Sequence, residues 1–160
     1  MKFEHLVVIN DPLNPLIEPL TPAQLWHGLV LRAQAPKLFV PWLDDCDIVA
    51  NAPHSLKRAL HYGEVTIRDQ VRFEPQHLIR YDIPAQNDIP ASTLTMHVEM
   101  PGADALTVRF SYDDSIEEVV GSMEAFYNGF RRSAYQESDI DTIRIIRELA
   151  AEGRFDTAES

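Results

Sequence analysis

The chain has 160 residues, the size of a single domain, and its 25 Asp and Glu against 14 Lys and Arg give a formal net charge of −11. Hydrophobic residues make up 45% and charged residues 24%, which is typical of a globular protein. One cysteine excludes an internal disulfide framework and a cysteine-based zinc site. No apolar run reaches the roughly 18 residues of a membrane helix, and the first residues lack the pattern of a signal peptide. We therefore expect one cytoplasmic domain over residues 1–160 with no membrane span.

Most of the negative charge lies in the second half of the chain. Residues 81–160 carry 16 acidic and 6 basic side chains. Such a surface repels phosphate backbones, which excludes nucleic acid as the main partner. Some of these charges fall in residues 152–160, EGRFDTAES, which we expect to form a frayed tail.

All 11 prolines lie within the first 101 residues, which begin with a strand. Phe3–Asn10 is rich in Val, Ile and Leu and stops at an Asp-Pro pair, which predicts a strand followed by an extended linker. Thr21-Pro22-Ala23-Gln24 then combines an N-cap threonine, a proline at the first helical position and a glutamine that can complete a capping box. We predict a helix from Pro22 and a second, short helix within Pro36–Trp42, ended before Pro41.

Beyond the helices, apolar residues recur at every second position, the period of a half-buried strand. Short turns separate the segments, which predicts an antiparallel meander with one apolar and one polar face. The predicted strands are Cys46–Ala50, Leu56–Tyr62, Val65–Phe73, His77–Ile83, Ser92–Met100 and Leu106–Asp113.

The last part of the chain is predicted to be a long helix that covers the apolar face of this sheet. Ser115-Ile-Glu-Glu118 has the form of a capping box. Apolar residues follow at helical spacing as far as Phe130, and a second apolar set runs from Ile140 to Leu149. At 100° per residue the two sets lie nearly opposite each other, so we predict a break near Tyr135–Ser138. The second set would then bury against another side of the domain or against a second copy in a homodimer.

The order of strand, two helices, six strands and a long helix resembles the helix-grip fold of the START/Bet v 1-like (SRPBCC) superfamily. The segments FEHLVVINDPLNPLIEPLTPAQLWHGLVLRAQAPKLFVPWLDDCDI, VTIRDQVRFEPQHLIRYDI and MEAFYNGFRRSAY resemble its AtaL-like branch, over about residues 2–152. The resemblance implies an α+β domain in which a curved seven-stranded antiparallel sheet grips the C-terminal helix around a hydrophobic cavity. It also implies a lipid- or polyketide-like ligand, because relatives bind such molecules and a minority are cyclases or aromatases.

A pair of opposite charges is predicted on the apolar face. A two-residue turn at Gly63-Glu64 makes cross-strand positions sum to 127, which places Arg58 opposite Asp69. Two charges on that face are costly unless they pair. The pair would be either a polar anchor that orients a carboxylate or enolate of a ligand, or a structural ion pair at the edge of the sheet or the mouth of the cavity.

Tyrosines are the other candidates for chemistry. Tyr62, Tyr81 and Tyr112 fall on the inward face of the sheet, and Tyr127 falls on the covering face of the helix. Their hydroxyls could donate to a ligand carbonyl or enolate, or could belong to an ordinary core. The full set of predicted cavity-lining residues is Arg58, Tyr62, Asp69, Tyr81, Met96, Phe110, Tyr112, Met123, Phe126, Tyr127 and Phe130.

No pattern in the sequence indicates a metal or a cofactor. The six histidines show no metal-binding spacing, and Asp44-Asp45-Cys46-Asp47 lacks the ligand spacing of a calcium loop. Cys46 has no obvious base beside it, and neither a phosphate loop nor a nucleophile elbow occurs. We expect no cofactor.

Three functions remain open from the sequence. The first is binding of a small apolar or amphipathic molecule inside the cavity. The second is an enzyme of the polyketide cyclase, aromatase or isomerase kind that uses the tyrosines with Arg58 and Asp69. The third is a non-catalytic interaction module whose acidic half binds a basic partner.

Overall fold

A computed structural model describes residues 1–156, and it contains one seven-stranded antiparallel sheet, two α-helices and a 3₁₀ turn. The elements in chain order are β1 (Lys2–Asn10), α1 (Pro22–Gln34), the 3₁₀ turn η1 (Pro36–Leu38), β2 (Asp45–Ala52), β3 (Ser55–Tyr62), β4 (Val65–Glu74), β5 (Leu78–Ile83), β6 (Ser92–Glu99), β7 (Leu106–Asp113) and α2 (Met123–Ala151). The predicted helix-grip class is confirmed.

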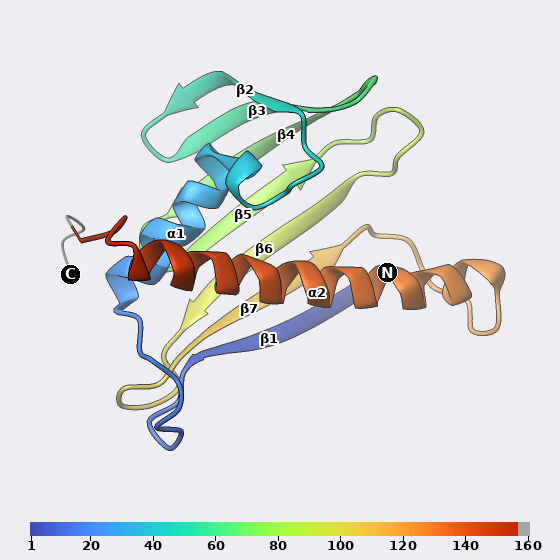
Figure 1. Cartoon of the computed structure of the whole chain (residues 1–160). Helices are drawn as coiled ribbons and strands as arrows, with labels where there is room; N and C mark the ends of the chain where they lie inside the picture. Colours follow the sequence, from blue (N-terminus) through green and yellow to red (C-terminus); the bar gives the residue numbers. More distant parts are fainter. Residues whose placement is uncertain (157–160) are drawn as a thin grey trace.

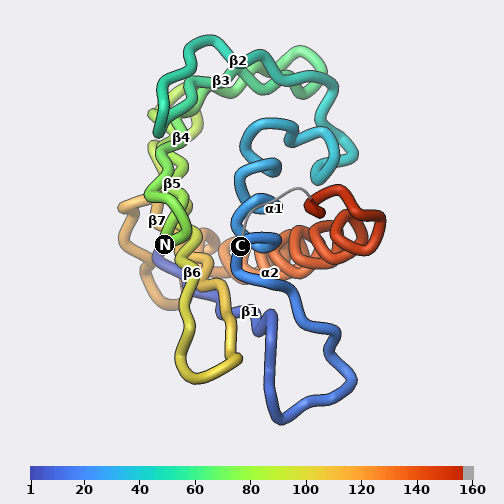
Figure 2. The backbone as a smooth tube through the Cα atoms, turned by 90° about the vertical axis from the view of Figure 1, so that its left-hand side faces the viewer, coloured from blue at the N-terminus to red at the C-terminus, as the bar shows by residue number. Residues whose placement is uncertain are grey.

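The sheet is strongly curved, and both helices lie on its concave side (Figure 1). Its strand order is β1-β7-β6-β5-β4-β3-β2, so β1 closes one edge by pairing with β7. In the view turned by 90°, the strands bend from β1 at the bottom to β2 above α1 (Figure 2). The concave face is apolar because side chains alternate across each strand, and the buried members of β6 are Leu94, Met96 and Val98.

The hairpin between β3 and β4 has the predicted register. Gly63 has a φ of +59°, a conformation that glycine adopts without steric cost, and Tyr62 pairs with Val65 across the turn. Arg58 consequently pairs with Asp69. A slip of one residue would have turned both charges to the opposite face.

Helix α1 begins as its sequence predicts. The Thr21 hydroxyl accepts from the Gln24 amide, and the Gln24 side chain accepts from the Thr21 amide. This capping box satisfies two amides that the first helical turn leaves without partners. The predicted second helix is shorter than expected, because only Pro36–Leu38 forms a 3₁₀ turn.

Helix α2 differs from the prediction at its start and in its middle. Ser115 has a φ of +61° and starts no helix, and Ser122 is the N-cap instead, with its hydroxyl accepting from the Ala125 amide. The helix then continues to Ala151, so the predicted break near Tyr135–Ser138 is wrong. The apolar set that ends at Phe130 and the set that begins at Ile140 do face different directions. The helix needs no break, because the aromatic residues of the first set are exposed to solvent.

The C-terminal half of α2 forms the solid part of the core. Ile143, Ile146 and Leu149 are buried, and Ile146 lies directly against Gly28 of α1. Phe155 also belongs to this core, so the chain stays packed beyond residue 152, where the predicted tail begins. The end of that predicted tail, residues 157–160, lies outside the described part of the chain.

No helix within residues 1–156 combines the length and the apolar composition that a membrane crossing requires.

Candidate functional site

A cavity of about 320 Å³ lies between the concave face of the sheet, the end of α1 and the middle of α2. Strands β3 to β7 form its floor, Arg32 and the segment around η1 form one side, and α2 contributes Tyr135 and Ser138. The lining mixes apolar side chains with a few charges and hydroxyls. Its residues are Met1, Arg32, Pro36, Val40, Arg58, Leu60, Tyr62, Ile67, Asp69, Tyr81, Ile83, Ser92, Thr93, Leu94, Tyr112, Asp113, Asp114, Tyr135 and Ser138.

Arg58 and Asp69 form a buried, two-pronged ion pair in the floor of this cavity. Arg58 Nε lies 2.9 Å from Asp69 Oδ1, and Arg58 Nη2 lies 2.6 Å from Asp69 Oδ2. The remaining nitrogen, Nη1, donates to the Ala33 carbonyl at 2.9 Å. Burial opposes the charge of the guanidinium, but its hydrogen bonds to Asp69 outweigh that cost and raise the pKa of Arg58. Every nitrogen of Arg58 is engaged within the protein, which favours the structural ion pair over the ligand anchor.

The Tyr81 ring lies close to two arginines. The guanidinium carbons of Arg32 and Arg58 lie 5.4 and 5.2 Å from the centre of its ring, within cation–π distance. The residue is only 3% exposed, and its buried hydroxyl has no hydrogen-bond partner among residues 1–156. Such a hydroxyl costs about 1–3 kcal/mol in an empty site. The wall of the cavity therefore contains an unsatisfied polar group.

Arg32 is the cavity's less constrained cation. Its Nε donates to the Thr142 hydroxyl at 3.2 Å, and no carboxylate within residues 1–156 forms an ion pair with it. Its positive charge acts on Tyr62, Tyr112 and Asp139, where it favours the ionised form of each group. Arg32 therefore lies close enough to the polar groups of the cavity to influence their ionisation.

A chain of hydrogen-bonding groups runs from the cavity wall into the protein. The Tyr112 hydroxyl donates to Asp139 Oδ1, and His5 Nδ1 lies 3.2 Å from Asp139 Oδ2. Burial raises the pKa of Asp139 to about 6, against the opposing effect of both partners. Burial and the neighbouring Asp139 carboxylate also raise the pKa of Tyr112. The arrangement places a carboxyl group that can hold or release a proton near neutral pH one hydrogen bond from the cavity.

Aromatic rings line the side of the cavity nearest α2. Tyr112 and Tyr135 stack with ring centres 4.1 Å apart and planes only 7° from parallel. Burial raises the pKa of both Tyr62 and Tyr135, so these phenols stay protonated near neutral pH. The walls can therefore contact a flat apolar molecule.

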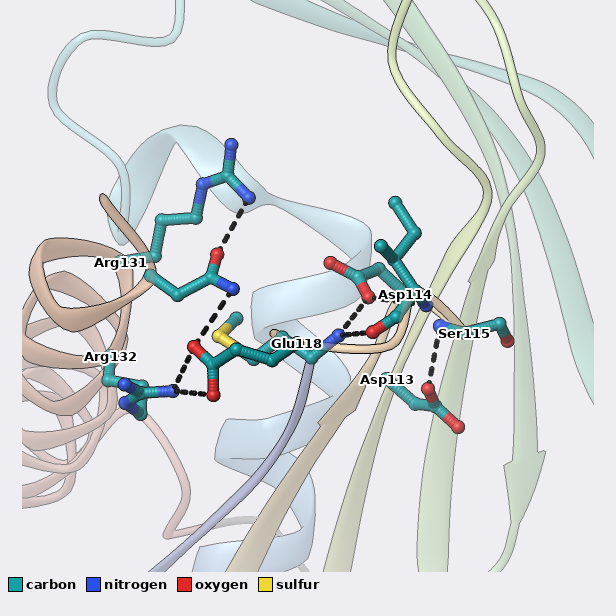
Figure 3. Close-up of polar contacts among 9 residues, drawn as sticks. Asp113, Asp114, Ser115, Glu118, Arg131 and Arg132 are labelled. Carbon is teal, nitrogen blue, oxygen red and sulfur yellow. Dashed lines mark hydrogen bonds and ion pairs between the residues drawn. The ribbon is translucent and has the colours of Figure 1, made fainter. Parts of the chain in front are cut away.

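The last residue of β7, Asp113, and the first residue of the loop before α2, Asp114, border the same cavity. Figure 3 shows polar contacts of this loop. Asp114 binds the amine of Met1. Glu118 accepts from Asn128 at 3.1 Å and from Arg132 at 3.2 Å, and these contacts bind the loop to α2. Glu118, which the sequence predicted as part of a capping box, therefore stabilises the loop instead.

The structure divides the predicted cavity residues into three groups. Arg58, Tyr62, Asp69, Tyr81 and Tyr112 line the cavity. Met96 and Phe110 are completely buried in the solid core of the sheet and line no part of it. The remaining four, which the sequence placed under the sheet, are exposed on the outer side of α2: Met123, Phe126, Tyr127 and Phe130.

Four residues of the site were missed from the sequence: His5, Arg32, Tyr135 and Asp139. Helical spacing places four residues on one face of α2: Tyr135, Asp139, Thr142 and Ile146. The sequence analysis did not group them, because it assumed that only apolar residues face the sheet. Arg32 similarly borders the buried face of Leu25, Leu29 and Ala33. No sequence signal connects His5 with Asp139, because their contact spans 134 positions.

A second groove, of about 520 Å³, shares Arg58 and Asp69 with the cavity. It also includes Lys57, Gln70 and Asp82, which alternate with the inward residues of their strands and so point to the convex face. Helices cover only the concave face (Figure 2), and the buried charges converge there, so we assign the site to the cavity. No group of three or more His, Cys, Asp or Glu within residues 1–156 converges as a metal site requires. The Cys46 thiol is partly buried, and burial raises its pKa.

Comparison with known structures shows the same fold at low sequence identity. The di-domain ARO/CYC StfQ from the steffimycin biosynthetic pathway shares 12% identity with a TM-score of 0.70, over 96% of this chain and 51% of that chain. The Zhui aromatase/cyclase from Streptomyces sp. R1128 shares 14% identity with a TM-score of 0.61, over 97% and 94%. Ara h 8.0201 shares 11% identity with a TM-score of 0.61, over 94% and 98%.

The sequence matches no curated protein. Residues 7–153 match the family described as AtaL, acetylaranotin biosynthesis cluster protein L. This match covers most of the chain, and the fold agrees with it. The chain belongs to the AtaL family and has the helix-grip, Bet v 1-like fold.

Proposed function

We propose that this protein binds a small apolar or amphipathic molecule in the cavity between the sheet and α2. The supporting observation is the cavity itself, about 320 Å³ in volume, with tyrosine rings and aliphatic side chains around a few buried polar groups. Its volume falls in the range of ligand sites, which are mostly apolar and carry few polar groups. The proposed setting is the cytoplasm.

Native mass spectrometry of the protein purified from its own source tests this proposal. We expect a bound small molecule that survives gentle ionisation. The test variant is Ser138→Phe, because Ser138 faces the cavity from α2 and a phenyl ring there would fill part of the space. Loss of the bound molecule in Ser138→Phe supports the cavity. Retention in that variant, or a molecule-free wild-type protein, contradicts it.

A second candidate function is catalysis of the cyclase, aromatase or isomerase kind. The chain of Tyr112, Asp139 and His5 favours it, because a carboxyl with a pKa of about 6 beside a phenol can accept and return a proton. Two of the three structures compared above are described as ARO/CYC or aromatase/cyclase, which makes the same chemistry a reasonable proposal here. Turnover of the bound molecule that Asp139→Asn abolishes without loss of binding would establish it.

A further inference from the structure

We infer that the molecule bound in the cavity carries a delocalised oxyanion, such as a carboxylate, phenolate or enolate, on a flat apolar body, and that Arg32 holds this group. The inference rests on the proposed function and adds the chemical class of the ligand. It depends on three features of the cavity: the pairing of its charges, the unsatisfied hydroxyl of Tyr81 and the stacked tyrosines.

Among the cations around the cavity, Arg32 is the one without an ion pair to a carboxylate within residues 1–156, although its charge also acts on the buried Asp139. Arg58 is neutralised by Asp69, and Asp114 binds the amine of Met1. Asp113 follows the inward-facing Tyr112 in β7, so it points to the other face of the sheet and reaches only the rim. Arg32 is thus the one cation of the cavity wall without a carboxylate partner in the part of the chain that the structure describes.

Arg32 also keeps its two terminal nitrogens available. Only its Nε is used, in the hydrogen bond to Thr142, which holds the side chain in place. Neither Nη1 nor Nη2 takes part in a hydrogen bond among residues 1–156. A planar fork of free donors suits a carboxylate or another oxyanion with two acceptor positions.

Tyr81 supplies the second, independent observation. Its ring lies beside Arg32 at 5.4 Å, its side chain lines the cavity, and its buried hydroxyl has no partner within residues 1–156. A buried hydroxyl without a partner is rare unless a ligand or water satisfies it. An oxygen atom held by Arg32 would lie close to Tyr81, whose ring centre is 5.4 Å from the Arg32 guanidinium carbon. The stacked rings of Tyr112 and Tyr135 would contact the flat part of the ligand.

Two matched fluorescent probes test the inference. 8-Anilinonaphthalene-1-sulfonate carries an oxyanion, and N-phenyl-1-naphthylamine has the same apolar body without it. We expect the wild-type protein to bind the sulfonate about tenfold more tightly, the effect of a charge-assisted hydrogen bond. Arg32→Met should remove this preference and leave the affinity for the neutral probe within about twofold, because the apolar walls are unchanged.

Three further variants localise the effect. Arg144→Met removes the same charge from the exposed side of α2, so both affinities should stay unchanged. Tyr81→Phe should weaken sulfonate binding while keeping or raising the melting temperature, since it removes an unsatisfied hydroxyl. Ser138→Phe should abolish binding of both probes, which excludes binding at the exposed aromatic residues of α2.

The outcomes separate the inference from the proposed function. Equal affinity for the two probes, or an Arg32→Met variant that keeps the preference for the sulfonate, overturns the oxyanion and leaves the cavity as an apolar site. Binding of both probes that persists in Ser138→Phe places them on the surface and overturns both proposals. Failure of both probes to bind the wild-type protein also overturns both.

Discussion

The space between the sheet and α2 is filled at one end and hollow at the other. Under the C-terminal half of the helix, the side chains of Ile143, Ile146 and Leu149 are buried and pack against the core. Under its middle, Tyr135 and Ser138 border the cavity, and Asp139 is buried beside it. The same helix therefore performs two tasks. The apolar residues at the C-terminal end of its inward face stabilise the fold. The polar residues one or two turns earlier on the same face leave a cavity, whose wall contains the unsatisfied Tyr81 hydroxyl.

The difference follows from which side chains occupy one inward face of α2. Ile146 and Leu149 bring volume and no polar atoms, so they close the gap to α1 and the sheet. Asp139 and Thr142 are shorter and must keep hydrogen-bond partners, so they hold Tyr112, His5 and Arg32 in fixed positions. Polar contacts of this kind define a site at some expense in stability.

The largest expected effect is at the hollow end, in Asp69→Asn. The change leaves the Arg58 guanidinium buried at 4% exposure without its counter-charge, which should lower the free energy of unfolding by about 3–5 kcal/mol. Chemical denaturation measures it. Glu99→Gln is the matched control, because the Arg109–Glu99 pair is partly exposed and should contribute less than about 1 kcal/mol. Equal losses in the two variants would show that the Arg58–Asp69 pair is solvated.

The filled end should respond to Ile146→Ala by about 2–5 kcal/mol, since the side chain is fully buried and its removal leaves a cavity. Ile140→Ala, on the exposed side of the same helix, should change stability by less than about 0.5 kcal/mol. Thermal and denaturant unfolding of both variants would provide the comparison. A small loss in Ile146→Ala would mean that the filled end is not well packed.

Gly28→Ala tests the close approach of α1 and α2. A Cβ atom there would lie 2.6 Å from Ile146 Cγ2, closer than real contacts allow, so we expect a loss of about 1–3 kcal/mol. Combining Gly28→Ala with Ile146→Ala should cost less than the sum of the two single changes, because alanine lacks all three side-chain atoms that the new Cβ would meet. A double-mutant cycle measures this coupling, and strictly additive effects would contradict the contact.

Asp139→Asn should change the pH dependence of stability. The pKa of Asp139 is about 6 in the folded protein against 3.8 for the free group, so between these values the folded state holds a proton that the unfolded state has released. Stability from this group is therefore greatest at acidic pH and falls as the pH rises through 6. The groups that face it are His5, Tyr112 and Arg32, which act in the opposite direction.

The asparagine variant should lack that fall and should gain about 3 kcal/mol over wild type at pH 7, with Tyr112 still able to donate to the amide oxygen. Asp141→Asn, an exposed neighbour on α2, is the control and should keep the wild-type profile. Unfolding free energies at several pH values would check this. Parallel profiles for wild type and Asp139→Asn would show that Asp139 is ionised throughout.

The residues that the sequence placed correctly are those whose position follows from local rules. The pairing of Arg58 with Asp69 needed only a two-residue turn and the period of two, and the start of α1 needed only a capping box. The start of α2 could not be predicted this way. Ser115 and Glu118 match a capping box, but tertiary contacts with Asn128 and Arg132 engage Glu118 instead.

The cavity itself could be expected only from the resemblance, because the same side chains can line a hollow or fill a core. The largest error has a specific cause. Apolar residues at helical spacing were assumed to face the sheet, which put Phe126 and Phe130 inside and left no place for Asp139. The buried face of α2 is instead partly polar, and hydrophobic periodicity carries no information about a polar face that becomes buried through long-range hydrogen bonds.

The smallest expected effect on stability comes from the exposed first stretch of α2, in the double variant Phe126→Ser and Phe130→Ser. These rings are 61% and 63% exposed and pack edge-to-face on each other at 5.2 Å, so they contribute little to the core. We expect the free energy of unfolding to change by less than about 1 kcal/mol in total. Exposed apolar groups of this size favour association, so sedimentation should show less concentration-dependent self-association in the variant than in wild type. A loss of stability comparable to that of Ile146→Ala would show that this stretch is buried against the domain, and it would remove the contrast between the two ends of α2.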